Sequence, residues 1–371
     1  MGRDAEDLAI QVAGQMFIAL CRASGKSVED QLVERQQLDA VTRVGYLDDK
    51  RRNSGTALVV KLANDGTHVW SRAYPVIFPG ATSGFMALCE NGDVALAGTL
   101  SGALDFDGSM LTSPLDEFTA WVARVSSSGE VVWAKTFNGP IEMAGAAIAC
   151  GPQGVIVFAA NIAGPADFGG GVLEPSTTMR GAMVVAALDS DGSHLFSRVF
   201  EASALVTDLA LQPTLEVSLV GSFGSSMDLG GGPVDAVSDD AFFARFEDPN
   251  TLLWAGHAGD PLAGTRATGV AVSSSDEMLV TGRLGGPYDF GQGPIGGYHQ
   301  LFLLKLGPDG APIASAAFGG PSETDETRVL LDGAGHVVLL GAFEGSLDFG
   351  QGSLSVPEYK RAIYLAKKCS F

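Results

Sequence analysis

Hydrophobic residues occur along this chain in pairs of short runs that are joined by a polar turn. Typical examples are FMALCENGDVALAG at 85–98 and VAVSSSDEMLVTG at 270–282. Two short apolar runs on either side of a turn predict a β-hairpin. The same pattern occurs at 8–21, 146–160, 209–221 and 329–341.

A second type of hairpin follows most of these pairs. It contains an Asx-Gly-type turn and an aromatic second strand, as in AWVARVSSSGEVVWAKTF at 120–137. Turn residues of this kind between apolar runs are a strong local signal for a hairpin. The related segments are 57–74, 183–200, 241–258 and 301–318, and Trp70, Trp133, Phe196 and Trp254 occupy one shared position in them.

An Asp-Phe-Gly phrase lies between the two hairpins of most repeats. Its aspartates are Asp105, Asp167, Asp228, Asp289 and Asp348, so that subtraction gives spacings of 62, 61, 61 and 59 residues. A fixed period of this length indicates a repeat architecture. The glycine content, 49 residues, fits a chain with many tight turns.

Each repeat therefore carries four short strands, which can bury their apolar faces only by stacking on neighbouring repeats. Four strands per unit is the β-propeller pattern. We predict an all-β fold, a single domain over 1–371 and a six-bladed β-propeller of about 61 residues per blade. Blade 1 would span about 6–75, blades 2–5 about 83–320 and blade 6 about 326–371.

The first repeat lacks the Asp-Phe-Gly phrase and contains an irregular insertion at 22–55. Ser27 and Asp30 resemble the start of a helix, so a short helix or an irregular excursion is expected over 27–44. A basic cluster lies in or near it, which is either a solvated loop or a surface for partner docking. Its members are Arg43, Lys50, Arg51 and Arg52.

The last repeat stops early, because 362–371 aligns with the third strand and no fourth strand follows. The final blade should then have three strands and an open edge. Basic residues flank this edge, either to block strand pairing or beside an edge that accepts a partner strand. They are Lys360, Arg361, Lys367 and Lys368. We expect a monomer, with strand pairing at 362–371 as the alternative.

These markers carry a resemblance to a known family. The run from GVAVSSSDEMLVTG at 269–282 through the following hairpin resembles the bacterial SBBP-type β-propeller repeats, and NHL-like propellers are similar. The DFGxG phrase resembles a variant found in uncharacterised bacterial proteins that are often exported. The resemblance implies a propeller and a binding or surface role. It brings no catalytic residue to this chain.

The formal net charge of −20 argues against nucleic acid and anionic lipid as partners. Cationic partners or plain solubility fit it better. There is no apolar run of 18 residues, so no membrane span is expected. Residues 8–21 resemble a signal-peptide core, but Asp4, Glu6 and Asp7 precede it and the repeat explains it better. The localisation is left open.

The four cysteines form no CxxC pair. Cys89 and Cys150 occupy the same place in successive repeats, where we expect them to lie too far apart for a disulfide. Both are therefore interpreted as small buried residues. Cys21 and Cys369 lie in the first and last repeats, which a closed ring would bring together, so a disulfide between them is open.

The polar residues give no catalytic, cofactor-binding or metal-ligating set. No two histidines have zinc-ligand spacing, and His68 and His194 are expected to be exposed on outer strands. The repeated aspartates are expected to accept backbone N–H groups in turns while the aromatic residue packs inward; calcium is the alternative. Recurrent basic residues on the third strand are expected to extend toward solvent; a ring of ligand contacts is the alternative. They are Lys61, Arg124, Arg245 and Lys305, and Ala187 breaks the series.

Three functions follow as hypotheses. The first is a non-enzymatic binding or scaffold protein for a protein or glycan, with its ligand on the loop-bearing face or at the mouth of a central channel. The second is a hydrolase or lyase with an active site at that mouth. The third is a purely structural surface protein. Propellers support all three, so the fold does not choose among them.

Overall fold

The fold is an all-β propeller arrangement of antiparallel sheets. The computed structural model describes residues 17–19, 42–49, 54–63, 67–77, 82–114, 117–175, 182–200, 202–248, 250–319, 324–350, 352–357, 361–368 and 371. One short 3-10 helix, Pro152–Gly154, occurs in this part of the chain. No helix in the same residues is both long enough and apolar enough to cross a bilayer.

The chain forms two compact units. One comprises Gln37–Ala236 and Phe242–Gly256, and the other comprises Met1–Gln36, Val237–Ala241 and His257–Phe371. The prediction of a single domain over 1–371 stays a prediction.

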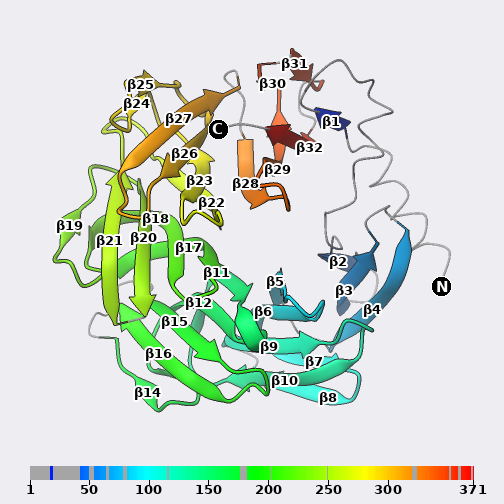
Figure 1. The fold of residues 1–371 in the computed structure, drawn as a ribbon. Coiled ribbons are helices and arrows are strands. Elements are labelled where there is room, and N and C mark those ends of the chain that lie inside the picture. Colours follow the sequence, from blue (N-terminus) through cyan, green and yellow to red (C-terminus); the bar gives the residue numbers. More distant parts are fainter. Residues whose placement is uncertain are drawn as a thin grey trace. The chain divides into compact units, whose positions relative to one another are not determined.

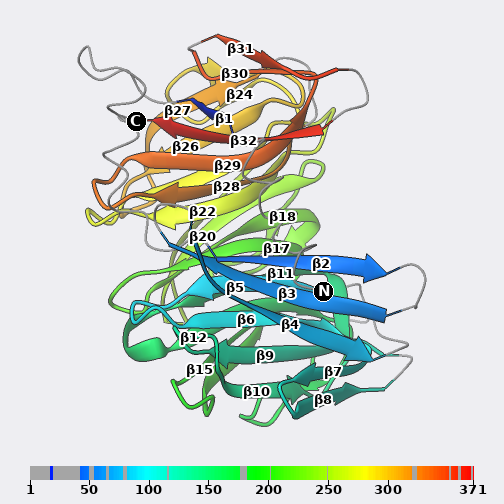
Figure 2. The same ribbon diagram turned by 90° about the vertical axis from the view of Figure 1, so that its right-hand side faces the viewer.

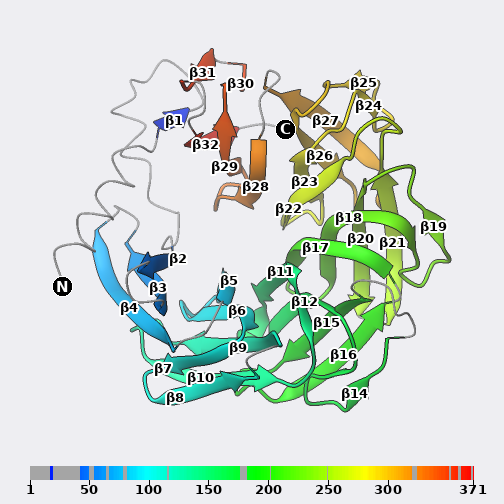
Figure 3. The same cartoon turned by 180° about the vertical axis from the view of Figure 1, so that it is seen from behind.

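The larger unit contains sheets with the predicted four-strand order (Figures 1 and 3). The first runs β5-β6-β9-β10, the second β11-β12-β15-β16 and the third β17-β18-β20-β21, each from its first strand to its outer edge. The bounds are β5 Thr82–Leu88, β6 Val94–Leu100, β9 Thr119–Val125, β10 Val131–Phe137, β11 Ile141–Cys150, β12 Ile156–Ile162, β15 Ala182–Leu188, β16 His194–Phe200, β17 Ala202–Leu211, β18 Val217–Met227, β20 Asp240–Asp248 and β21 Thr251–Ala258. These strands overlap the predicted hairpins, although β11, β17 and β18 extend several residues beyond them.

The smaller unit contains one more sheet of this order, β22-β23-β26-β27, and the sheet β28-β29-β32 with β1 at its edge. The bounds are β22 Arg266–Val272, β23 Met278–Arg283, β26 Leu301–Leu306, β27 Pro312–Phe318, β28 Thr324–Leu331, β29 Val337–Glu344, β32 Arg361–Lys368 and β1 Phe17–Ala19.

Short two-residue or three-residue strands flank the Asp-Phe-Gly turns. They are β13 Ala166–Asp167, β14 Val172–Leu173, β19 Val234–Asp235, β24 Tyr288–Asp289, β25 Pro294–Ile295, β30 Ser346–Asp348 and β31 Ser353–Ser355.

The six-blade prediction is not confirmed, because five sheets of the described chain have four strands in propeller order. The first repeat differs and runs β2-β3-β4-β7-β8. The bounds are β2 Thr42–Asp49, β3 Ser54–Leu62, β4 His68–Ile77, β7 Gly102–Phe106 and β8 Ser109–Ser113. Its strands β3 and β4 are the predicted second hairpin.

The prediction for the first hairpin of this repeat is wrong. Residues 42–49, which we placed in an irregular insertion, form β2 and pair with β3 from Thr42↔Lys61 to Asp49↔Ser54. A hairpin between segments this close in sequence closes a much shorter loop than one that uses 8–21, and short loops cost less entropy. The rest of the predicted helix at 27–44, up to residue 41, lies outside the described residues.

The edge of the last sheet is not open as predicted. Strand β1 pairs in parallel with β32, through Phe17↔Tyr364, Ile18↔Leu365 and Ala19↔Ala366 (Figure 2). The alignment of 362–371 with a third strand is confirmed, because β32 pairs with β29. The strand that covers its edge comes from 17–19, part of the segment that we had assigned to the first repeat.

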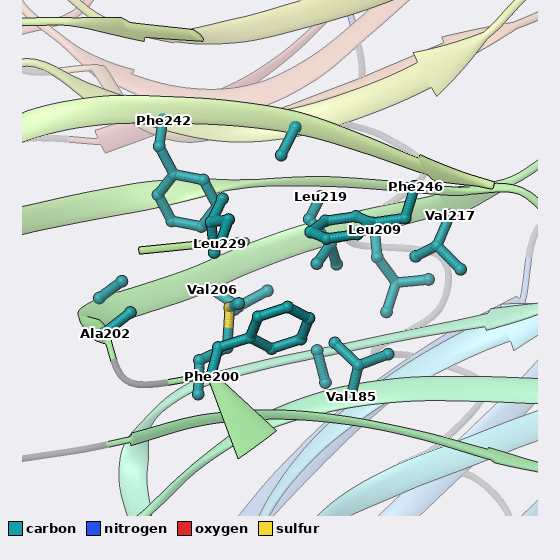
Figure 4. Packing of buried hydrophobic residues seen from close by; sticks show 14 of the residues in the cluster. Val185, Phe200, Ala202, Val206, Leu209, Val217, Leu219, Leu229, Phe242 and Phe246 are labelled. Atoms are coloured by element: carbon teal, nitrogen blue, oxygen red, sulfur yellow. The ribbon is translucent and has the colours of Figure 1, made fainter. Parts of the chain in front are cut away.

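Neighbouring sheets of the larger unit stack through apolar side chains. One cluster contains Phe200 and Phe246, whose ring centroids lie 5.3 Å apart, together with Val185, Leu209 and Leu219 (Figure 4). These residues come from different sheets and are all nearly inaccessible to solvent. Burial on both faces explains why the middle strands β6, β12 and β15 are buried along their whole length.

The outer strands carry a β-bulge at a shared position. In β10 the pairing shifts between Val131 and Trp133, which leaves Val132 unpaired and 52% exposed. The same shift leaves Leu195 of β16 and Ile313 of β27 half-exposed. Bulges of this kind protect edge strands from pairing with other chains.

The prediction that Cys89 and Cys150 stay unbonded is wrong, because they form a disulfide with their Cα atoms 4.9 Å apart. The two residues are not equivalent. Leu88 pairs with Val94, the first residue of β6, and Cys150 pairs with Ile156, the first residue of β12. Leu88 is therefore the equivalent of Cys150, and Cys89 lies one residue beyond that position. Successive side chains of a strand point to opposite faces. The offset therefore turns the two sulfur atoms toward each other. Cys21 and Cys369 lie outside the described residues.

Candidate functional site

The repeated aspartates act in turns, as predicted. The Asp167 carboxylate accepts the N–H groups of Gly169 and Gly171, at 2.7 and 3.1 Å, and Asp228 accepts those of Gly230 and Gly232 at the same distances. Asp289 repeats the arrangement at 2.7 and 2.9 Å with its two glycines. In each case one carboxylate oxygen accepts both backbone N–H groups of the turn.

The other parts of the phrase are structural too. Phe106 and Phe168 are fully buried, and Gly169 and Gly171 have φ values of 102° and 104°, which a side chain would strain. Within the described residues, no group of three or more His, Cys, Asp or Glu side chains is placed to hold a metal ion. The phrase therefore shapes a turn.

The basic residues of the third strand do not extend toward solvent as predicted. Arg124 is 7% exposed and forms an ion pair with Asp93, and Arg245 is 2% exposed and pairs with Glu216. Lys305 pairs with Glu277 at 2.9 Å in the smaller unit. Because isolated buried charge is costly, Arg124, Arg245 and Lys305 are each matched by an acid that immediately precedes the second strand. Lys61, the remaining member of the series, instead donates to the carbonyl oxygens of Gly92 and Ser127, at 3.2 and 3.0 Å.

The exception supports this interpretation. Where the series is broken by Ala187, the position of the acid is occupied by Val155, so both charges are replaced together. The sheet β11-β12-β15-β16 therefore leaves no unpaired charge at this place. The recurrent ion pair is a structural device of the repeat.

The recurrent aromatic residues of the outer strand also have a structural role. Trp70 donates its indole N–H to the carbonyl of Ser127, at 2.9 Å, and Trp133 donates to Ser190 at 3.0 Å. Both acceptors lie in a turn of the next sheet. A Cβ at Gly129 would lie 2.9 Å from the Trp70 ring, so the turn needs glycine there. These contacts join neighbouring sheets of the larger unit.

The repeat is broken in a different way at the end of the sheet where β20 begins and β21 ends. Asp240 stands where the other sheets have Thr119, Ala182 and Gln300. His257 stands where they have Thr136, Val199 and Ala317. Two polar residues thus depart from the repeat on adjacent strands of one sheet.

These two residues are in contact. The His257 Nδ1 atom lies 3.1 Å from Oδ2 of Asp240, which is completely buried, whereas the histidine side chain is 39% exposed. The carboxylate also accepts the N–H groups of Val237, at 3.2 Å, and Ser238, at 3.1 Å. An ionised carboxylate only accepts hydrogen bonds, so His257 donates through Nδ1–H. The buried acid thereby fixes the orientation of a partly exposed imidazole.

The connection Gly259–Thr265 packs beside this pair and is longer than the connection 138–140 between β10 and β11. Ser238 donates its hydroxyl to the carbonyl of Asp260 at 2.7 Å. The Asp260 carboxylate accepts the N–H of Leu262 at 2.8 Å, so the tip is held in a defined turn. Leu262 is nevertheless 78% exposed.

We call Val237–Asp240, His257 and Gly259–Thr265 the loop site. Close backbone packing supports it. A Cβ at Gly259 would lie 1.9 Å from Oδ1 of Asp240, and one at Gly285 would lie 1.9 Å from the carbonyl oxygen of Ala263. Only glycine fits such contacts, so both positions let the backbone close around the buried carboxylate and the loop.

The charges around the loop site are mixed. Arg266 and Asp239 form an ion pair at 3.0 Å, with both side chains about half-exposed. Burial, reinforced by the negative charges of Asp240 and Asp289, raises the pKa of the Tyr288 hydroxyl, so this group stays protonated at neutral pH. The site therefore offers hydrogen-bond donors and acceptors together with exposed apolar groups, since Val237 is 59% exposed.

The spacing of the histidines along the chain does not reveal this site. Its signal in the sequence is the departure of two positions from the repeat, which shows only in a comparison of equivalent positions. That comparison would have found Asp240 and His257, although not their contact across 17 residues.

The other candidates are placed as follows. His68 is exposed, as predicted, but His194 is half-buried and its Nε2 lies 3.1 Å from the Ser197 hydroxyl. Lys367 forms an ion pair with Asp332 at 2.7 Å, and Lys368 lies over the rings of Phe318 and Phe371. The two lysines therefore contact the protein itself. Residues 50–53 and Lys360 lie outside the described residues, as do the side chains of Arg43 and Arg361.

No family model and no curated protein matches this chain. It resembles a solved protein of unknown function from Bacteroides caccae with 9% identity and a TM-score of 0.42, over 84% of this chain and 95% of that one. It resembles an ulvan-degrading polysaccharide lyase with 11% identity and a TM-score of 0.43, over 74% and 71%. It resembles the NanB sialidase of Streptococcus pneumoniae with 7% identity and a TM-score of 0.39, over 80% of this chain and 79% of that one. The fold follows from strand order, and no activity follows from these likenesses.

Proposed function

We propose that this chain is a non-enzymatic binding propeller that contacts a protein partner through the loop site. The observation that carries the proposal is Leu262, an apolar side chain exposed by 78% on a turn that Asp260 holds in place. A pre-organised contact residue loses little conformational entropy on binding, which favours affinity.

The surroundings of Leu262 support a protein partner. The hydrogen bond from Ser238 to Asp260 joins the segment that bears exposed Val237 to the loop that bears Leu262. Polar groups, among them His257 and the Asp239–Arg266 pair, accompany these two apolar side chains. Apolar contacts with a polar rim are typical of protein interfaces. The net charge of −20 favours a partner with a basic surface.

A random peptide library displayed on phage, selected against the immobilised protein, tests the proposal. We expect selection of peptides that combine basic and apolar residues, and loss of their binding in Leu262→Ser. Selection of no peptide, or of peptides that bind Leu262→Ser equally well, contradicts the proposal. Binding on an array of defined glycans that Leu262→Ser leaves unchanged and His257→Ala abolishes would identify a carbohydrate ligand instead.

A second candidate, a hydrolase or lyase, is favoured by the Asp240–His257 contact. A histidine that a buried carboxylate orients is a common general base. The test is hydrolysis of a panel of chromogenic esters and glycosides, with elimination from uronate-containing polysaccharides as the lyase assay. Activity that His257→Ala abolishes and Thr136→Ala, at the corresponding position of another sheet, preserves would support the enzyme.

A further inference from the structure

The Cys89–Cys150 disulfide joins two neighbouring sheets of the larger unit at their first strands. Cys89 follows the last residue of β5 and Cys150 is the last residue of β11. Strands β5 and β11 lie against each other. The bond thus links residues that are 61 positions apart in the chain.

The sheets present these two sulfur atoms to each other through a one-residue offset. Phe85, Ala87 and Cys89 of one strand face the same apolar cluster as Ile148 and Cys150 of the other. Met86 and Leu88, which alternate with them, belong to a different cluster. Neither sulfur could reach the other if both cysteines held equivalent positions, because both would then point the same way.

The bond lies against an apolar cluster, and its Cys89 side is buried. Cys89 is 3% exposed and Cys150 is half-buried, and the apolar cluster around them includes Ile148, Ile156 and Phe158. Thiol–disulfide exchange requires an attacking thiolate to reach a sulfur atom along the bond axis. Because Cys89 is 3% exposed, an oxidant of protein size cannot reach its sulfur atom once the two sheets have packed.

We infer that this pair is a target of a thiol–disulfide oxidant in an oxidising compartment, and that it is oxidised before the two sheets close on each other. Structural disulfides persist in such compartments, whereas the thiol systems of the cytosol keep cysteines reduced. The inference concerns where and when the chain folds, and it is independent of the function proposed for the loop site.

The oxidation of the two cysteines proceeds through two thiol–disulfide exchange steps. The thiolate of one cysteine attacks the oxidant's disulfide and forms a mixed disulfide, which releases one oxidant thiol. The thiolate of the second cysteine then attacks the bonded protein sulfur, forms Cys89–Cys150 and releases the second oxidant thiol. The cysteines lose two electrons and two protons, and the oxidant's disulfide takes up both.

Peptide mapping of protein isolated from the cells that make it tests the compartment. Cells are lysed directly into iodoacetamide, and the protein is digested with trypsin without reduction. We expect fragment 73–124, with Cys89, to be linked to fragment 136–180, with Cys150. Carbamidomethyl groups on both cysteines would overturn the inference. The Cys21→Ser/Cys369→Ser variant should retain the linked fragments.

The rate of reduction tests the order of events. The protein is treated with dithiothreitol with and without 6 M urea, and samples are alkylated and mapped over time. We expect reduction of Cys89–Cys150 in the folded protein to be at least about tenfold slower than in urea, because the bond opens only with the sheets. Equal rates would show that the folded protein admits thiols, which would overturn the proposed order of oxidation and packing.

Discussion

The Nδ1 atom of His257 lies 3.1 Å from a carboxylate oxygen of Asp240 that has no contact with solvent. Burial of a carboxylate destabilises the folded state unless several donors form hydrogen bonds with it. Here two backbone N–H groups and the imidazole form these hydrogen bonds. Because neither residue occurs at the corresponding positions of the other four-stranded sheets described, the contact is a local addition to the repeat.

Replacing Asp240 by Ala should destabilise the protein by about 1–3 kcal/mol, because three part-buried donors lose their common acceptor. The measurement is the free energy of unfolding from urea titration. Asp239→Ala is the matched control. It removes an ion pair whose members are about half-exposed, and it should cost less than about 1 kcal/mol. Equal losses in the two variants would contradict the role assigned to Asp240.

Arg245→Ala should destabilise the protein by about 3 kcal/mol, because it removes the ion-pair partner of the Glu216 carboxylate and leaves it the weaker hydrogen bond from Gln212. The chain itself suggests the compensating change. The sheet with Val155 and Ala187 lacks both charges, so Glu216→Val combined with Arg245→Ala should be more stable than Arg245→Ala alone. A double-mutant cycle of unfolding free energies measures this coupling. A double variant that loses the sum of the two single losses would refute the paired interpretation.

Asp332 should make the protein sensitive to acid. Burial alone would raise the pKa of its carboxyl, but hydrogen bonds from Lys367 and His336 outweigh burial and hold that pKa well below its usual range. The stabilisation is then fully present above the ordinary value for an unfolded Asp, about 3.9, and is lost as the pH falls below it. Urea midpoints between pH 7 and pH 2.5 should fall more steeply for the native chain than for Asp332→Asn. Parallel curves would contradict this assignment.

Gly171→Ala should cost about 1–3 kcal/mol through backbone strain alone, because Gly171 has a φ of 104° and a Cβ there would meet no atom within 4 Å. Gly297→Ala is the control, since that glycine does not have a positive φ and a Cβ would make no contact closer than 3.9 Å. Thermal unfolding of the two variants measures the difference. A loss for Gly297→Ala as large as that for Gly171→Ala would show that the turn does not impose the strain.

Much of the fold could be predicted from the sequence, because each repeat encodes its hairpins locally. The predicted turns at Asp167 and Asp228 are confirmed for the same reason. Each carboxylate accepts hydrogen bonds from N–H groups that lie within four residues of it. Local patterns do not determine which edge a detached segment joins. The pairing of 17–19 with β32 and of 42–49 with β3 was therefore missed.

The contacts between residues far apart in the chain could not be predicted from local pattern, and this includes the contact between Asp240 and His257. The Cys89–Cys150 bond depends on a shift of one residue between strands, which the similar phrases MALC and AIAC concealed. Arg124 and Arg245 were predicted to be exposed because the acidic residues with which they pair are 31 and 29 residues away in the chain. Contacts of this range depend on the register of the sheets.

The affinity of a peptide selected from the phage library, measured by calorimetry against four forms of the protein, tests the central claim most directly. Leu262→Ser and Val237→Ser should each weaken binding at least about tenfold, which corresponds to about 1.4 kcal/mol. Leu195→Ser, which alters a half-exposed aliphatic residue on the outer strand β16, should leave binding unchanged. Equal weakening by Leu195→Ser, or full affinity in Leu262→Ser, would show that the loop site is not the binding surface.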